Sequence, residues 1–136
     1  MSEPRPAYPE PVPDADNRAL LEGWREGRLF LQHCGGCGRS VFYPRPMCPF
    51  CWSTNLVWRK SEGRGEIVSF SLIHRPNHPS FVDEVPIVLA EVRLAEGALL
   101  LARVLSQAPR TGLKISLLPL PEARRYPLPI FRPAVE

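Results

Sequence analysis

The sequence predicts a mainly β fold in which one short N-terminal helix precedes two small β modules. The only four cysteines form two C-x2-C pairs separated by ten residues, a spacing typical of a metal-binding ribbon. After residue 63, apolar and polar residues alternate over several short stretches that are separated by turn residues. Seventeen prolines gather mainly near the two ends of the 136-residue chain, where they disfavour helices and central strands.

The N-terminal part is expected to contain a flexible arm and then the single helix. Residues 1–13 are polar and rich in proline, which is typical of an extended arm. Residues 14–28 are expected to hold the helix. Its signals are cap residues at both ends and an apolar stripe between them, namely Asp14 or Asp16, Gly27, and Leu20, Leu21 and Trp24.

Residues 29–62 are predicted to form a zinc ribbon of three short strands, at 29–33, 41–43 and 56–60. These strands carry too little apolar bulk to fold without a metal. The predicted metal ligands are the four thiolates of the two knuckles, Cys34, Cys37, Cys48 and Cys51. We favour structural zinc over iron, which four thiolates also accept. Two disulfides or four unpaired core thiols are the alternative that the spacing leaves open.

Residues 63–136 are predicted to form a small antiparallel barrel of the OB-fold type, with a proline-rich C-terminal tail. Four stretches have the alternation or turn signals of strands, and a last, short stretch is expected at an edge. They are residues 66–74, 87–94, 98–105, 113–118 and, at the edge, 130–132. No helical pattern separates them, which favours a barrel over a βαβ arrangement.

Composition and charge exclude several classes of protein. An apolar share of 44% is enough for a core. The sequence has no run of about 18 apolar residues, so it predicts no membrane span. The polar N-terminus lacks the apolar region of a signal peptide, so we expect a cytoplasmic protein, in keeping with four metal-binding thiols. A net charge of +3 permits an anionic ligand but is too small to indicate nucleic acid by itself.

The loop after the first barrel strand is the candidate ligand or partner site outside the ribbon. Prolines stiffen this loop and lower the entropy cost of presenting its polar groups. The alternative is a rigid barrel loop whose side chains make only local hydrogen bonds. The candidate residues are His74, Arg75, Asn77, His78 and Phe81, with Arg45 beside the knuckles as a weaker candidate.

Several stretches besides the cysteines match one known family in the same order along the chain. They are residues 21–29, 32–38, 43–51, 63–65, 74–81, 84–87 and 128–133. The sequence thus resembles the DUF35 family, small proteins with an N-terminal helix, a rubredoxin-like zinc ribbon and a C-terminal OB fold. Residues 118–127 depart from the family pattern, because they are shorter and richer in proline than the acidic strand and loop expected there.

The resemblance implies a non-catalytic accessory subunit of an acyl-CoA enzyme. Such partners are thiolases, lipid-transfer-protein-like aldolases and, for some members, enoyl-CoA hydratases. The residues agree, because all four thiols are assigned to metal and the three histidines have no matching nucleophile. In this interpretation Arg75 pairs with a CoA phosphate, and Phe81 covers the adenine or the pantetheine arm.

Two other functions stay open at this stage. The first is a single-stranded nucleic-acid-binding module, since zinc ribbons and OB folds both occur in such proteins. The predicted barrel strands argue against it, because they carry few aromatic residues and no Lys/Arg stripe. The second is a free-standing enzyme, either a zinc hydrolase or a redox ribbon, which a closed site of four thiolates disfavours.

Overall fold

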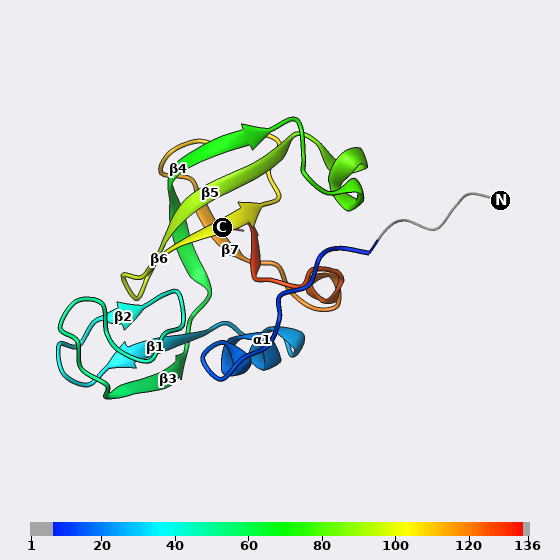
Figure 1. The fold of residues 1–136 in the computed structure, drawn as a ribbon. Coiled ribbons are helices and arrows are strands. Elements are labelled where there is room, and N and C mark those ends of the chain that lie inside the picture. Colours follow the sequence, from blue (N-terminus) through cyan, green and yellow to red (C-terminus); the bar gives the residue numbers. More distant parts are fainter. Residues whose placement is uncertain (1–6, 135–136) are drawn as a thin grey trace.

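The computed structural model describes residues 7–134, in which a three-stranded sheet lies beside a closed barrel (Figure 1). The order of elements agrees with the mainly β fold predicted from the sequence. The elements are α1 (Arg18–Arg25), β1 (Phe30–Cys34), β2 (Ser40–Val41), β3 (Leu56–Lys60), β4 (Arg64–Ile73), the 3₁₀ helix η1 (Pro79–Glu84), β5 (Ile87–Leu94), β6 (Leu99–Val104), β7 (Lys114–Leu117), the 3₁₀ helix η2 (Glu122–Arg125) and β8 (Ile130–Pro133).

The helix α1 begins and ends close to its sequence signals, but the predicted cap is wrong. Asn17 is the N-cap residue and its side chain does not cap the helix. The Asp14 carboxylate instead accepts hydrogen bonds from the backbone N–H groups of Asp16 and Asn17, both at 2.8 Å, and so shapes the turn before the helix. Gly27 follows the helix at φ +79°, a conformation that glycine adopts without a steric penalty.

The ribbon has three strands, as predicted, and they form an antiparallel sheet with the order β2-β1-β3. Its central residue Gln32 pairs with Val41 on one side and with Trp58 on the other. The buried Gln32 amide donates to the Arg45 carbonyl and accepts from the Arg45 N–H, both at 2.9 Å. These two bonds fix the chain where it turns toward the second knuckle.

The barrel closes through five strands in the order β4-β5-β6-β8-β7. Two details of the sequence prediction are wrong here. The stretch near residue 130 is no edge strand, because β8 lies between β6 and β7, and the barrel is not wholly antiparallel, because β6 and β8 run parallel. The physical reason is burial. Phe131 is fully buried, and the position of β8 between β6 and β7 brings this ring into the barrel core.

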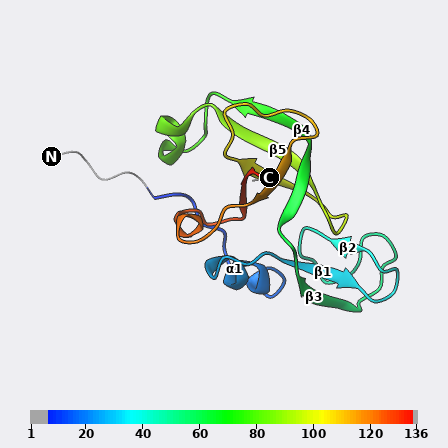
Figure 2. The ribbon, with the colours of Figure 1, turned by 180° about the vertical axis from the view of Figure 1, so that it is seen from behind.

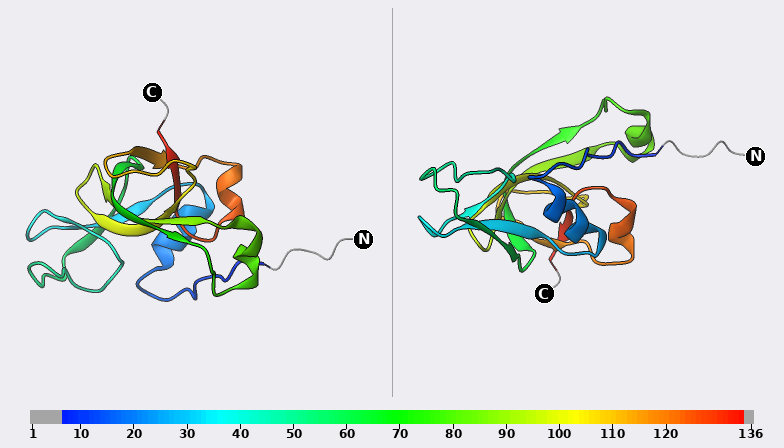
Figure 3. Two further views of the ribbon diagram at one scale, coloured as in Figure 1. Left: turned by 90° about the horizontal axis from the view of Figure 1, so that it is seen from above. Right: turned by 60° about the horizontal axis from the view of Figure 1, so that its bottom comes forward.

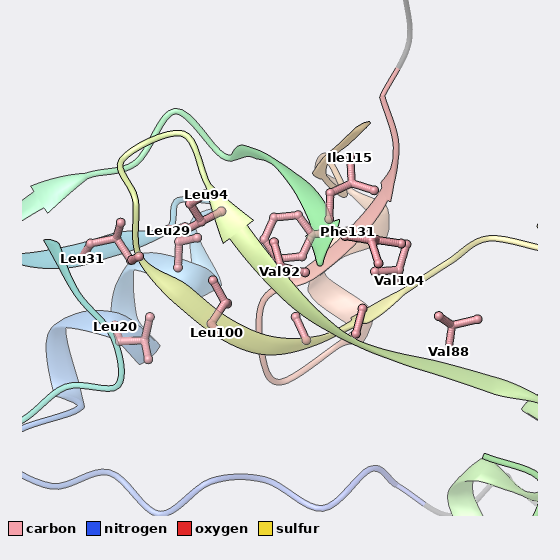
Figure 4. Packing of buried hydrophobic residues seen from close by; sticks show 14 residues of the cluster. Leu20, Leu29, Leu31, Val88, Val92, Leu94, Leu100, Val104, Ile115 and Phe131 are labelled. Atoms are coloured by element: carbon pink, nitrogen blue, oxygen red, sulfur yellow. The ribbon is translucent and has the colours of Figure 1, made fainter. Parts of the chain in front are cut away.

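The ribbon and the barrel share one hydrophobic core (Figure 4). Leu20 from α1 and Leu29 and Leu31 from the start of the ribbon pack in the same cluster as the barrel residues Leu94 and Leu100. The helix thus covers the side of the barrel that faces the ribbon (Figure 2). The two modules therefore stabilise each other through apolar contact.

The N-terminal segment crosses the barrel side between the two 3₁₀ helices (Figure 3). Of the predicted flexible arm 1–13, residues 1–6 lie outside the described part. In the remainder, the Tyr8 ring stacks on Phe81 beside η1 and on Tyr126 beside η2, with centroid distances of 5.2 and 5.7 Å. Within residues 7–134, none of the helices has both the length and the apolar character that crossing a bilayer requires.

Replacement of Trp24 by phenylalanine is expected to loosen the C-terminal segment from α1. The buried Trp24 indole donates a 2.8 Å hydrogen bond to the Tyr126 carbonyl and packs against Leu118 and Ile130. Loss of this bond and of ring volume should cost about 2 kcal/mol of unfolding free energy, measured by urea denaturation. Trp58→Phe is the matched control, and equal losses in both variants would contradict the role of the Trp24 hydrogen bond.

Candidate functional site

The four cysteines converge at the end of β1, in the loop that follows it and in the loop that precedes β3. All four Sγ atoms lie within 4.8 Å of one another, with 3.5 Å between Cys34 and Cys51 and 3.7 Å between Cys37 and Cys48. All four thiols are free, so the disulfide alternative is wrong. A tetrahedral centre with metal–sulfur bonds of about 2.3 Å places its sulfurs about 3.8 Å apart. The donor set therefore fits one structural metal ion.

Backbone N–H groups prepare the knuckles for metal by stabilising thiolate charge. The N–H groups of Cys37 and Gly36 lie 3.4 and 3.3 Å from the Cys34 sulfur. The Cys37 N–H lowers the pKa of the Cys34 thiol to about 6; burial acts in the opposite direction and the Gly36 N–H adds to the fall. Such N–H groups around a thiolate also orient it toward the metal. The glycines of the first knuckle make this close approach of backbone to sulfur feasible.

A second cluster of polar groups lies at the other end of the molecule, around the carboxylate of Glu84. The Arg103 guanidinium donates to Glu84 at 2.8 Å, the Tyr8 hydroxyl donates at 2.6 Å, and Arg125 lies 3.7 Å away. The side chains of Glu84 and Arg103 are only 10% and 18% exposed. We call Tyr8, Glu84, Arg103, Arg125 and Tyr126 the Glu84 cluster.

Aromatic rings and guanidinium groups pack together in the Glu84 cluster. The Arg103 guanidinium carbon lies 5.9 Å from the centre of the Tyr126 ring, and that of Arg125 lies 5.8 Å from the centre of the Tyr8 ring. Stacked rings and cation–π contacts add to the ion pair. The cluster thereby ties the N-terminal segment to η1, β6 and η2.

An apolar pocket of about 380 Å³ opens beside the Glu84 cluster. Its walls come from the N-terminal segment, from the loop before η1, from β5 and β6, and from the segment after η2. Most of the wall is aliphatic or aromatic, and two arginines and one amide add polar groups. The lining residues are Tyr8, Pro9, Ile73, Arg75, Pro76, Asn77, Phe81, Ile87, Leu89, Arg103, Tyr126, Pro127, Leu128, Pro129 and Ile130.

The structure separates the six candidate ligand-loop residues into two groups. Arg75, Asn77 and Phe81 line the apolar pocket. The other three do not line it. The His78 ring makes local hydrogen bonds: its Nδ1 accepts from the Ser80 N–H at the start of η1 and lies 2.7 Å from the Ser80 hydroxyl.

The remaining two candidates lie away from that wall. His74 is exposed at the end of β4, outside the pocket lining. Arg45 lies in the ribbon, where its Nε donates to the Tyr43 carbonyl at 3.0 Å. The loop that the sequence singles out therefore contributes one wall of a pocket.

Sequence reasoning did not find the other half of the pocket. Tyr8, Arg103 and Tyr126 come from segments that are far apart in the chain, and no local motif connects them. One signal was present: Arg103 is a charged residue within an otherwise apolar strand. On an antiparallel barrel strand such a residue points outward, where it can pair with a carboxylate.

A four-thiolate ribbon joined to a closed five-stranded barrel defines the zinc-ribbon and OB-fold class of proteins. Two family descriptions match the chain: "ChsH2, rubredoxin-like zinc ribbon domain" over residues 21–57, and "ChsH2, C-terminal OB-fold domain" over residues 58–117. A DUF35 domain-containing scaffold protein of Pyrococcus furiosus is 32% identical over 69% of this chain and 73% of that protein. The chain belongs to the DUF35 family, as its sequence motifs predicted.

Another relative is longer than this chain. A probable enoyl-CoA hydratase alpha subunit of Thermomonospora curvata is 34% identical over 98% of this chain, but the match spans only 42% of that protein. A chain of the Ltp2-ChsH2(DUF35) aldolase has a similar structure, with a TM-score of 0.77, 34% identity, and coverage of 93% of this chain and 100% of that chain.

A DUF35 protein of Sulfolobus solfataricus has the same fold at lower sequence similarity. Its structure matches with a TM-score of 0.63 and 16% identity, over 85% of this chain and 83% of that chain. This match concerns the fold alone, since the two sequences have diverged too far to carry more.

Proposed function

We propose that this chain is a non-catalytic accessory subunit that binds and stabilises, or completes, a thiolase-like acyl-CoA enzyme, either a thiolase or a lipid-transfer-protein-like aldolase. The observation that carries the proposal is the likeness to a chain of the Ltp2-ChsH2(DUF35) aldolase, which extends over the whole of that chain. The scaffold-protein name of the Pyrococcus relative supports it. An enoyl-CoA hydratase is the other partner class, supported by the name of the Thermomonospora relative.

We assign the four-thiolate site to structural zinc. Four thiolates at tetrahedral separations occupy every coordination position, so none is left for a substrate or water. A cytoplasmic location suits this assignment, because a reducing environment keeps the thiols available to metal. One equivalent of zinc per chain in a colourless preparation is the expected result of elemental analysis, and a red, iron-loaded protein would contradict it.

The apolar pocket is proposed to receive the pantetheine arm of the partner's acyl-CoA. Its volume lies near the lower end for ligand pockets, which suits a slender arm better than a whole CoA. Aliphatic walls such as Ile87 and Leu89 suit the methylene and methyl groups of pantetheine, and the Asn77 amide suits its amides. Arg75 is exposed at the rim, where a guanidinium can pair with a phosphate.

Co-expression with a thiolase-like acyl-CoA enzyme from the same organism tests the proposed function. We expect a stable complex in gel filtration, with acyl-CoA activity that the partner alone lacks or loses quickly. The accessory role would be refuted if no complex forms or if the isolated chain turns over acyl-CoA by itself.

Replacement of Arg75 by alanine tests the pocket assignment in that complex. Loss of one phosphate contact should raise KM for acyl-CoA about tenfold with little change in kcat, because the contact is made equally in ground and transition states. Arg110→Ala is the matched control, since Arg110 is also exposed but lies outside the pocket. Equal KM values for the two variants would contradict a CoA contact at Arg75.

A further inference from the structure

The end of the ribbon farthest from the apolar pocket presents large apolar side chains to solvent. The two cysteine loops project away from the barrel and from the N-terminal segment (Figures 2 and 3). On the second loop, Trp52 is 77% exposed, Phe50 is 55% exposed and Met47 is 44% exposed. The Arg39 guanidinium from the first loop lies 4.7 Å from the centre of the Phe50 ring. We call Arg39, Met47, Phe50 and Trp52 the knuckle tip.

Trp52 occupies a backbone position that favours glycine. The two knuckles have equivalent turns: the Gly38 N–H donates to the Cys34 carbonyl, and the Trp52 N–H donates to the Cys48 carbonyl, both at 2.9 Å. The residue after the second cysteine of each pair has positive φ, +78° at Gly38 and +68° at Trp52. Among the described non-glycine residues, Trp52 alone has positive φ.

A tryptophan in this position is unfavourable for the free chain. A bulky residue at positive φ is strained, and strained positions concentrate at functional sites. Burial does not offset the strain here, because most of the indole is in water. Glycine would satisfy the same turn, as it does in the first knuckle. The side chain is therefore better explained by what it contacts in a complex than by the stability of this chain.

The charges of the ribbon indicate the chemistry of the partner. Residues 29–60 contain four basic residues, Arg39, Arg45, Arg59 and Lys60, and no acidic residue. The rest of the chain holds the other 13 basic residues and all 14 acidic ones. Arg39 belongs to the knuckle tip, whereas Arg59 and Lys60 lie at the end of β3 that is away from the cysteines. An apolar anchor beside a basic residue, in a ribbon without acidic residues, is complementary to an apolar pocket that carboxylates surround.

We infer that the knuckle tip is a docking anchor, with Trp52 inserting into an apolar, carboxylate-rimmed pocket on the partner protein subunit. The inference rests on the proposed function and names the surface of this chain that performs it. Tryptophan and arginine are the residues most enriched where interfaces concentrate their binding energy. The knuckle tip and the apolar pocket lie at opposite ends of the molecule, so docking through the tip leaves the pocket accessible.

A protein partner fits the knuckle tip better than a nucleic acid. The Phe50 ring has one face covered by Arg39, which leaves less aromatic surface for stacking with bases. Met47 is flexible and apolar, and such side chains adapt well to protein grooves. Four basic residues in the ribbon also provide only weak electrostatic attraction to a phosphate backbone.

Trp52→Gly separates a binding role from a structural role. We expect the variant to keep its metal and its melting temperature, or to gain a few degrees, because the strain at positive φ is relieved. Its affinity for the thiolase-like partner enzyme from the same organism should fall about 30-fold or more, measured by titration of the purified proteins. Leu101→Ala is the control, because Leu101 is 70% exposed but lies on the barrel.

The outcomes distinguish this inference from the proposed function. If the wild-type chain does not bind the enzyme, the proposed function fails, and this inference with it. If the wild-type chain binds and Trp52→Gly binds equally well, only the docking anchor fails. A drop in melting temperature or metal content with Trp52→Gly would also overturn it, since the indole would then be structural. A labelled single-stranded oligonucleotide provides a further test. If it binds tightly, and if Trp52→Gly abolishes this binding but leaves enzyme binding unchanged, the knuckle tip is a nucleic-acid site and not a docking anchor.

Discussion

Replacement of Cys37 by serine is expected to unfold the ribbon and to abolish assembly with the partner enzyme. A serine hydroxyl stays protonated at neutral pH and is a poor substitute for a thiolate ligand. The ribbon has little else to stabilise it, because its own buried cluster consists of Cys34, Val41 and Cys48 with Leu56 beside them. In small domains a structural zinc contributes about 10 kcal/mol or more to folding.

The damage from Cys37→Ser should extend into the barrel. Leu29 and Leu31 belong to the same core cluster as the barrel residues Leu94 and Leu100. Unfolding of the ribbon therefore also removes apolar contacts from the barrel core. We therefore expect loss of bound metal, a broadened thermal transition and no complex in gel filtration. Thr54→Ser, an exposed change in the other cysteine loop, is the matched control. A Cys37→Ser protein that keeps a full equivalent of metal and still assembles would refute the structural role of the site.

The ribbon could be predicted from the sequence because its ligands are close together in the chain. Two C-x2-C pairs and their flanking strands all lie within residues 30–60, so the spacing of the cysteines alone indicates the geometry of the site. The long alternating stretches likewise predicted β4, β5 and β6. In contrast, β8 has only four residues and ends at Pro133, and its place between β6 and β7 depends on pairing with distant strands. Local pattern does not contain that information.

The Glu84 cluster escaped prediction for the same reason. Tyr8, Glu84, Arg103 and Tyr126 come from four segments that only the closed barrel brings together. His78 illustrates another limit of local pattern, since its place among polar loop residues suggested a ligand contact, and in this structure its Nδ1 accepts from the Ser80 N–H at the start of η1. Side-chain-to-backbone bonds of this kind are common for polar residues next to a turn. Residue type therefore indicated that a side chain makes polar contacts, but not whether those contacts are with a ligand or with the protein itself.

The Glu84 cluster is expected to be the main polar contribution to the stability of the N-terminal segment. Glu84→Gln removes the charge from a side chain that is only 10% exposed and leaves the Arg103 guanidinium without its counter-ion. Hydrogen bonds to charged groups contribute about 1.5–3 kcal/mol each, so we expect a loss of about 3 kcal/mol. For a chain of this size that is a fall of about 10 °C in the melting temperature, measured by calorimetry. Asp83→Asn, an exposed change of equal charge at the neighbouring residue, should have little effect.

The pH dependence of this stability difference tests the ionisation of Glu84 itself. Burial alone would raise the pKa of Glu84, but the hydrogen bonds from Tyr8 and Arg103 and the nearby guanidinium charges outweigh it, and the pKa lies below its ordinary value of 4.5. A lowered folded pKa stabilises the fold fully above the ordinary value, and this stabilisation is lost as the pH falls through the folded pKa. The advantage of the wild-type chain over Glu84→Gln should therefore be constant from pH 6 to 8 and shrink below about pH 4.5. A difference that stays the same at pH 3.5 would mean that packing, and not the charge of Glu84, holds the N-terminal segment in place.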